Sequence, residues 1–330
     1  MSLRKSLNHK GHRGSSSKGV FDIVVATIND LIDRTTTTKK FVLVGVRWLH
    51  SRFRASRVKE EPSVSFVVQL LFFVLVTVGL ACHGRTAQEL RVCSDPNNLP
   101  FSNQKQEGFE NRLAELIAAE LHATVRYTWW AERRGFLRNT LNAGQCDIVM
   151  GMPPGTGGVL TTRPYYRSTY VFVSRRARSL TISSFDDPIL RRLKIGVQLV
   201  GDDYANTPPV HALSRRGIVK NIVGFRVVGD YSEPNPPARI MDAVAADDVD
   251  VAIAWGPLAG YFAKRSRVPL ELAPVQPAFD PPGLRFVFDI ALAVRKDDQK
   301  LKTELDQILV KRKPAIDSIL DSYGVPRVPD

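Results

Sequence analysis

Short apolar runs and amphipathic stretches alternate along the chain from residue 90 onward. Runs with strand-like composition lie at 90–93, 125–127, 147–150, 170–174, 194–200, 223–228, 249–254, 270–272 and 289–294. Apolar residues at helical spacing predict helices at 109–121, 136–141, 301–311 and 315–323, with two more beginning at Pro208 and after Pro237. Pro314 is expected to separate the last two helices. This alternation predicts an α/β protein whose mostly parallel sheets are flanked by helices.

Polar residues cluster directly after two of the predicted strands, 90–93 and 194–200. The candidate side chains at these strand ends are Asp95, Asn97, Asn98, Asp202, Asp203, Asn206 and Thr207. Because open α/β sheets bind ligands outside the carboxyl ends of their strands, we expect both clusters to line one site between two similar lobes. The alternative is local, since Asp-Pro and Asn-Asn favour turns and Thr207 before Pro208 suits a helix N-cap.

Most of the positive charge lies in the N-terminal part of the chain. Residues 1–64 hold 13 Lys and Arg against 5 Asp and Glu, a net of +8, and residues 85–330 hold 33 against 28, a net of +5. Nucleic-acid binding would require a basic patch in the folded part, and this excess is too small for one. We therefore predict no nucleic-acid partner.

An apolar run extends from Phe66 to Ala81 and follows several basic residues. A membrane span needs about 20 apolar residues, and the small residues that end this shorter run are typical of a signal segment. We assign 65–86 to a signal segment and predict a periplasmic protein that contacts the membrane only through this segment. The basic segment 1–64 stays unassigned and suggests a start site placed too far upstream. The alternatives are a cytoplasmic extension with one anchor, or lipidation of Cys82.

Beyond the signal segment the chain has two cysteines, Cys93 and Cys146. An even number of cysteines in an exported chain favours a disulfide. Two buried free thiols are the alternative, because cysteine also packs as a small apolar residue.

Several runs together resemble the two-lobed periplasmic solute-binding proteins, in the order of their amino-acid-binding branch. These runs are 90–93, 108–110, 141–151, 164–166, 195–198, 249–252 and 290–296. The resemblance implies a type II periplasmic binding protein fold with two hinge crossings. It also implies a first lobe of 88–176 plus 286–330 and a second lobe of 190–280.

Longer runs resemble a narrower family over about 88–328. The runs 91–103, 133–144, 164–173, 201–209 and 255–262 are similar to the methanol-oxidation J-type proteins (MxaJ/XoxJ), which are associated with quinoprotein dehydrogenases. This resemblance implies a periplasmic accessory protein that aids assembly or activation of a methanol or alcohol dehydrogenase dependent on pyrroloquinoline quinone (PQQ). It implies no cofactor for this chain itself and leaves open whether a small molecule binds.

Two positions depart from the amino-acid-binding proteins. Those proteins usually place an Arg after the third strand to pair with the ligand carboxylate, whereas residues 153–158 here read Pro-Pro-Gly-Thr-Gly-Gly. They also place an Asp after the strand equivalent to 249–254, where this chain has Trp255. Binding a zwitterion without both partners would leave its charges desolvated and unpaired. We therefore expect that free α-amino acids are not ligands.

Aromatic and basic residues near the strand ends are further candidates for a binding surface. Trp130 and Trp255 are candidate aromatic contacts. The adjacent Trp129 points to the opposite side of a strand from Trp130, so at most one of the two can join the site. A basic cluster of Arg133, Arg134 and Arg138 is either a solvated face or a docking surface for an anionic partner.

The sequence offers little support for an enzyme or a metal site. It contains no nucleophile-elbow, Walker or zinc-protease motif, and beyond residue 86 only His122 and His211 are histidines. Asp202 and Asp203 supply too few spaced oxygen ligands for calcium. We predict a binding protein without enzymatic activity. The alternative to the accessory role is a receptor that delivers a small polar, non-amino-acid ligand to an ABC importer.

Overall fold

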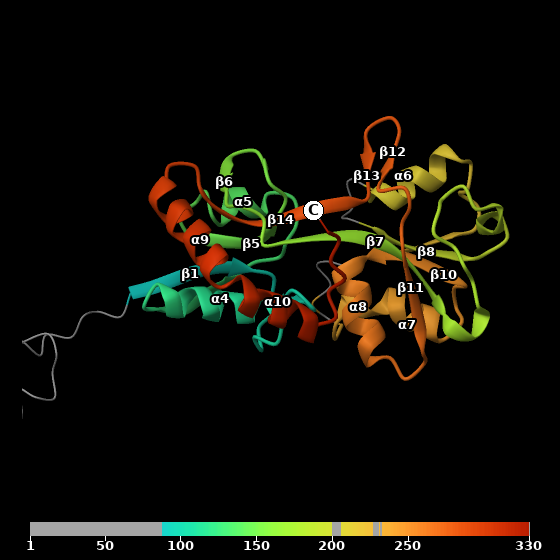
Figure 1. The fold of residues 1–330 in the computed structure, drawn as a ribbon, viewed down its shortest axis with the longest axis horizontal. Coiled ribbons are helices and arrows are strands. Elements are labelled where there is room, and N and C mark those ends of the chain that lie inside the picture. The colour runs from blue at the N-terminus through green and yellow to red at the C-terminus, as the bar shows by residue number, and fades with distance from the viewer. Residues whose placement is uncertain (1–87, 200–205, 227–230, 232, 330) are drawn as a thin grey trace, which may run out of the picture. The chain divides into compact units, whose positions relative to one another are not determined.

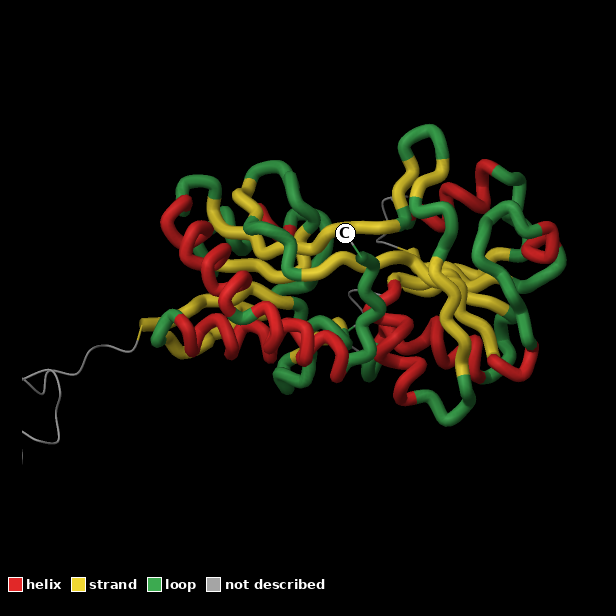
Figure 2. The backbone as a smooth tube through the Cα atoms, in the orientation of Figure 1, coloured by secondary structure: helices red, strands yellow, loops and turns green. Residues whose placement is uncertain are grey.

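Ten strands join into one mixed sheet that runs through both lobes (Figures 1 and 2). Their order is β4-β1-β5-β14-β7-β10-β8-β9, with β6 paired to β14 and β11 paired to β7. The computed structural model describes residues 88–199, 206–226, 231 and 233–329, all within one compact unit. The predicted signal segment, Cys82, Asp202 and Asp203 lie outside the described residues.

The first lobe is built on the strands at the β4 end of the sheet. Its strands are β1 (Gln88–Ser94), β4 (Ala123–Trp129), β5 (Ile148–Met152), β6 (Val159–Thr161) and the small pair β2 (Asn97–Asn98) and β3 (Ser102–Asn103). Its helices are α4 (Phe109–Glu120), α5 (Phe136–Asn139), α9 (Gln299–Lys311) and α10 (Lys313–Ser322).

The second lobe is built on the strands at the β9 end. Its strands are β8 (Ile195–Leu199), β9 (Ile222–Arg226), β10 (Val251–Trp255), β11 (Leu270–Pro274) and the hairpin β12 (Phe279–Asp280) with β13 (Leu284–Arg285). Its helices are α6 (Pro208–Arg215), α7 (Arg239–Ala245) and α8 (Gly256–Arg265), with short 3-10 turns at Arg176–Arg178, Pro188–Arg191 and Pro236–Ala238.

Two long strands, β7 (Tyr166–Arg175) and β14 (Val287–Arg295), belong to both lobes (Figure 1). The first part of β14 pairs antiparallel with the first part of β7, and its later residues pair with β5 and β6. The later part of β7 pairs with β10 and β11. The remaining neighbours, β1 with β4 and β5 and β8 with β9 and β10, are parallel as predicted. The sheet is mixed because the crossing strands run against their neighbours. The lobe boundaries deduced from the sequence stay a proposal.

The hydrophobic core follows the two lobes. In the first lobe, one cluster packs α4, α9 and α10 against the sheet around Phe109 and Leu292, and a smaller one surrounds Cys93 and Cys146. In the second lobe, one cluster joins α7 and α8 to β10, and another packs α6 against β8. The predicted burial of Ile240 in α7 is complete.

Local sequence explains where α4 begins. Gly108 precedes it, and a Cβ at this position would lie 1.9 Å from the Phe101 backbone O, so only glycine fits. The side-chain Oδ1 of Asn111 accepts the Gly108 backbone N–H at 3.0 Å. This bond satisfies one of the amides that a helix start leaves free.

Three predicted helix ends shift by a few residues. The helix predicted at 136–141 ends at Asn139, and α9 begins at Gln299 rather than 301. The break between α9 and α10 falls at Arg312, so Pro314 lies in the first turn of α10 rather than between the helices. The first turn tolerates proline because its amides have no partner within the helix.

Candidate functional site

The first polar cluster lies at the end of β1, where Asp95 is buried with only 2% of its surface exposed. Its Oδ1 accepts the backbone N–H of Asn97 at 2.8 Å. Its Oδ2 accepts the backbone N–H of Glu132 at 2.8 Å and the hydroxyl of Tyr231 at 3.1 Å. Three donors from the chain itself therefore offset the burial of this carboxylate.

Two of these contacts join the lobes directly. Tyr231 and Glu233 lie between β9 and α7 of the second lobe. In addition to the bond from Tyr231 to Asp95, the Nδ2 of Asn97 donates to the backbone O of Glu233 at 2.9 Å. The Arg133 guanidinium lies over the Tyr231 ring at 5.9 Å from its centre. The polar end of β1 is thus in contact with the second lobe.

Two carboxyl groups that sequence reasoning missed lie beside this cluster. The buried Asn98 donates from Nδ2 to Glu132 Oε2 at 3.3 Å. Burial, and then the charge of Asp95, raise the pKa of Glu132 to about 7. Burial, and then the charge of Glu132, raise the pKa of Glu110 well above its ordinary value. Near neutral pH Glu132 therefore holds a proton for much of the time.

The position of Glu110 depends on a glycine at the end of β5. Gly151 has a φ of +73°, and a Cβ there would lie 2.6 Å from Glu110 Oε1. The carboxyl group therefore rests against bare backbone. Glu110 belongs to the run 108–110 that carried the family resemblance, so a signal for it existed. Glu132 lies in no motif.

Trp255 is half-buried at the end of β10, beside the crossing strands. Its ring centre lies 5.2 Å from that of Tyr170 on β7 and 6.0 Å from that of Phe288 on β14. Its backbone N–H donates to Gln198 Oε1 of β8 at 2.6 Å. The Tyr166 hydroxyl, whose pKa is raised by burial, interacts with the Trp255 indole. This residue therefore links three strands at the junction of the lobes.

The second polar cluster is described only in part. Asn206 is exposed and forms an isolated antiparallel bridge with Leu199. Thr207 occupies the predicted N-cap position of α6, but its hydroxyl makes no cap bond. The hydroxyl donates instead to the Gln198 backbone O at 3.1 Å and is buried.

Trp129 and Trp130 have different surroundings. Trp129 stacks on Tyr127 with ring centres 4.5 Å apart. Trp130 follows β4, donates its backbone N–H to the Ser94 O at 3.0 Å and has 46% of its surface exposed. The nearby Arg133, Arg134 and Arg138 are exposed.

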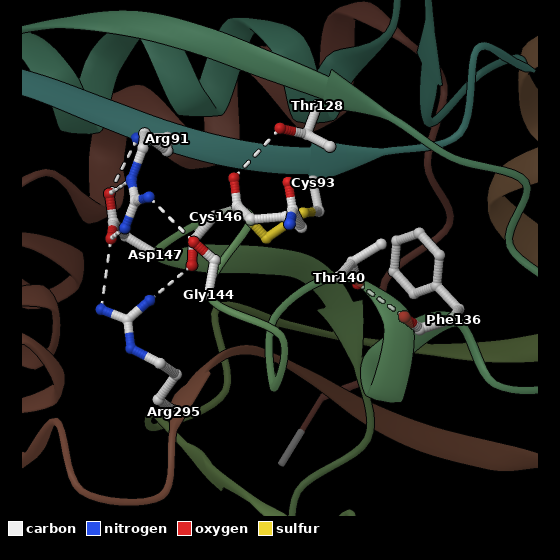
Figure 3. The surroundings of a disulfide bond; sticks show 10 residues. Arg91, Cys93, Thr128, Phe136, Thr140, Gly144, Cys146, Asp147 and Arg295 are labelled. Carbon is white, nitrogen blue, oxygen red and sulfur yellow. Dashed lines mark hydrogen bonds and ion pairs between the residues drawn. A yellow bond between two sulfur atoms is a disulfide. The ribbon is translucent and has the colours of Figure 1, made fainter.

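The predicted disulfide between Cys93 and Cys146 is present and ties β1 to the residue before Asp147 (Figure 3). Beside it, Arg91 donates from Nε and Nη2 to the Asp147 carboxylate at 3.0 and 2.6 Å, and Arg295 of β14 also contacts this carboxylate (Figure 3). Burial of Asp147 acts to raise its pKa, but its bonds with Arg91 and Arg295 outweigh this effect and lower it. The disulfide and the ion pairs together connect β1, β14 and the segment before β5.

Two surface cavities lie away from the predicted site residues. One, of about 250 Å³, lies beside Glu89, Ala123 and Lys300, and the other, of about 420 Å³, lies beside the β12–β13 hairpin. The described ranges contain no group of three or more His, Cys, Asp or Glu residues arranged to hold a metal ion. Within the same ranges, no helix is long and apolar enough to cross a membrane.

The family model of bacterial extracellular solute-binding proteins, family 3, matches residues 90–325. The chain belongs to this family. Protein MoxJ of Methylorubrum extorquens is 33% identical over 251 residues, which cover 74% of this chain and 83% of that protein. Among solved structures, MxaJ from Methlophaga aminisulfidivorans MPT is 28% identical with a TM-score of 0.64, and the periplasmic binding protein XoxJ from Methylobacterium extorquens AM1 is 36% identical with a TM-score of 0.60. The matches cover 72% and 73% of this chain and all of each solved chain.

These matches confirm the type II fold and the J-type resemblance deduced from the sequence. In this solute-binding protein, the loop 153–158 that lacks the expected Arg bonds within itself and to β6. The Thr156 hydroxyl donates to the Pro153 O at 2.6 Å, and the Gly155 N–H donates to Thr161 Oγ1 at 3.2 Å.

Proposed function

We propose that this chain is a periplasmic, solute-binding-like accessory protein that aids assembly or activation of a PQQ-dependent methanol or alcohol dehydrogenase. The observation that carries the proposal is the set of hydrogen bonds that the polar residues at the end of β1 make with the second lobe. Asp95 and Asn97, which would face a ligand, bond instead to Tyr231 and Glu233 of the second lobe. The chain itself thus occupies the polar groups with which a solute receptor would hold its ligand.

The two positions that bind amino acids in related receptors support the same proposal. The loop 153–158 offers no guanidinium for a carboxylate, and Trp255 replaces the carboxylate that would pair with an ammonium group. Trp255 instead packs against Tyr170 and Phe288. A binding protein with these changes fits a protein partner better than an amino acid.

The relatives support the choice of partner. The J-type proteins, which this chain resembles in its longest runs, are associated with quinoprotein methanol dehydrogenases. The MoxJ and XoxJ relatives are the most similar of those compared above by identity and extend over nearly the whole described part. The candidate contact residues for the dehydrogenase stay Asn97, Asn98, Asp202, Asp203 and Trp255, although Asn98 is buried in the structure and would have to be uncovered to contact a partner.

A Trp255→Ala variant tests the role of the residue at the lobe junction. We expect lower dehydrogenase activity in cells at an unchanged level of dehydrogenase protein, because the variant removes the ring that links β7, β10 and β14. Trp255→Phe is the matched control, since it keeps an aromatic ring in contact with Tyr170. Immunoblots of the accessory protein exclude simple loss of the chain. Unchanged activity with Trp255→Ala would count against this role.

A receptor for an ABC importer is the second candidate, favoured by an acidic group beside the end of β1. Glu132, with a pKa of about 7, is a half-buried carboxyl group that a small polar ligand with hydrogen-bonding groups could contact. A ligand that binds only the folded state raises the unfolding temperature. A thermal-shift screen of small polar solutes separates the candidates, because the accessory role predicts no stabilisation.

A further inference from the structure

An open groove lies where the β12–β13 hairpin meets the crossing strands and the C-terminal segment. Its volume is about 420 Å³, within the range of about 300–1,000 Å³ typical of ligand pockets. Its apolar lining comes from Ala278, Phe279, Val287, Val328 and Pro329, and its charge comes from Arg167 and Arg285. We call these seven residues the hairpin groove. It shares none of the residues that carry the proposed function.

The hairpin that forms one wall is held firmly by α6. Arg216 makes a bidentate pair with Asp280, with Nη1 to Oδ2 at 2.9 Å and Nη2 to Oδ1 at 3.0 Å. Arg215 donates to the backbone O of Pro281 and of Pro282 at 3.3 and 3.1 Å. Bidentate Arg–carboxylate pairs are among the strong, directional contacts in proteins, so this wall of the groove is preformed.

The C-terminal segment forms another wall and is also fixed. The Val328 N–H donates to the backbone O of Arg167 at 3.1 Å, and the Ser168 hydroxyl donates to the Pro326 O at 2.6 Å. The groove floor is β7 and β14 themselves. A partner seated in the groove would therefore touch the strands that cross between the lobes, together with both walls.

The hairpin presents an aromatic ring and a cation side by side. Phe279 and Arg285 are directly opposite in the β12–β13 pair, so their side chains lie on the same face. Phe279 is 44% exposed. Among the described residues, the Arg285 side chain makes no hydrogen bond or ion pair, whereas Arg167 pairs with Asp289 at 3.2 Å. The positive charge available to a partner is therefore that of Arg285.

We propose that the hairpin groove docks a protein segment that carries an apolar side chain next to a carboxylate. The apolar side chain would fill the groove between Phe279 and Val328, and the carboxylate would pair with the Arg285 guanidinium. Aromatic residues and arginine in a preformed pocket are the usual composition of binding hot spots, and the charge complementarity selects an acidic segment. Identification of the segment as part of the dehydrogenase rests on the proposed function.

Surface plasmon resonance with immobilised dehydrogenase tests the proposal. Phe279→Ser and Arg285→Glu should each weaken binding at least tenfold, and Arg285→Lys should weaken it less because it keeps the charge but loses the planar fork. Val310→Ser and Lys300→Glu are matched controls, since they change an exposed apolar residue and an exposed cation on α9. Wild-type-like binding by both groove variants overturns the docking site and leaves the proposed function standing.

A peptide probe tests binding to the hairpin groove even if the dehydrogenase does not bind at all. Failure of the wild type to bind either form of the dehydrogenase would contradict the proposed function. Saturation-transfer NMR with the peptide acetyl-Leu-Phe-Glu-Asp-amide then measures binding to the hairpin groove directly. Saturable binding that Phe279→Ser and Arg285→Glu abolish supports a docking site for another partner of this chemistry. No binding, or equal binding by the variants, overturns it.

Discussion

At the scale of single residues, the site depends on contacts between positions far apart in the sequence. Asp95 was predicted from its place after a strand, and the structure puts it at the end of β1. Its partner Tyr231 is 136 positions away, and no local pattern marks that pairing. Glu132 lies in no motif, and its raised pKa arises only because folding buries it near Asp95. Sequence patterns therefore located the polar positions but not their partners.

The raised pKa of Glu132 makes stability depend on pH. The folded chain holds the proton up to about pH 7, whereas an unfolded glutamate releases it near its ordinary pKa of about 4.3. Between these values the folded state binds more protons, so the free energy of unfolding falls as the pH rises from 5 to 8. We expect Glu132→Gln to reduce this fall by on the order of 1–2 kcal/mol. One pKa unit corresponds to about 1.4 kcal/mol, and because the Glu132 side chain is only half-buried, solvent screens part of the effect.

Urea unfolding of the wild type and of Glu132→Gln at pH 5 and pH 8 measures this effect. Glu115→Gln is the control for loss of an acidic side chain, because Glu115 lies on the exposed side of α4. If the free energy of unfolding changes by the same amount between pH 5 and pH 8 in both proteins, Glu132 keeps its ordinary pKa in the folded protein.

At the scale of elements, the spacing of apolar residues predicted the helices and strands that are long enough to show a repeating pattern. The helix at 109–121 corresponds to α4, and the predicted strands overlap β1, β4, β5 and β7 to β11, and β14. The two-residue strands β12 and β13 were missed because they are too short for a pattern and lie among prolines. The helix α8 was also missed, since Pro257 and two glycines lower its helix propensity. The hairpin groove was therefore invisible to the sequence analysis.

The start of α4 can be tested at Gly108. A Cβ there would lie 1.9 Å from the Phe101 backbone O, which cannot move aside as a flexible side chain can. We expect Gly108→Ala to lower the free energy of unfolding by about 1–3 kcal/mol, the usual cost of overpacking. Gly157→Ala, with open space at its Cβ, should leave stability nearly unchanged. Thermal unfolding of both variants checks this, and equal unfolding temperatures would contradict the close contact.

The disulfide can be tested by removing both cysteines. It closes a loop of 53 residues, for which the chain-entropy model gives about 4 kcal/mol of stabilisation. The double variant Cys93→Ala and Cys146→Ala should therefore unfold at a lower urea concentration than the oxidised wild type. A reducing agent should destabilise the wild type and have no effect on the variant. If the reducing agent destabilises neither protein, the disulfide does not form.

At the scale of the whole molecule, the mixed sheet and the contacts at the end of β1 join the two lobes. β7 and β14 cross between the lobes, and Trp255 packs where they meet β10. The fold class followed from the order of strands and helices together with the family resemblance. The contacts between the end of β1 and the second lobe did not follow from either.

The chain lacks the Arg and the Asp with which related receptors bind the carboxylate and the ammonium group of an amino acid. This predicts that the whole protein does not bind free amino acids. Calorimetry of residues 87–330 with each of the free α-amino acids should show no saturable heat, because neither the loop 153–158 nor Trp255 can pair with a zwitterion. Micromolar binding of any one amino acid would contradict this reasoning and favour the importer receptor.

The most direct test of the accessory role is binding of residues 87–330 to a purified quinoprotein methanol dehydrogenase, measured with both the apo and the PQQ-loaded enzyme. The accessory role predicts saturable binding, and stronger binding to the apo form would place the protein at a step before cofactor loading. Absence of binding to both forms would contradict the accessory role.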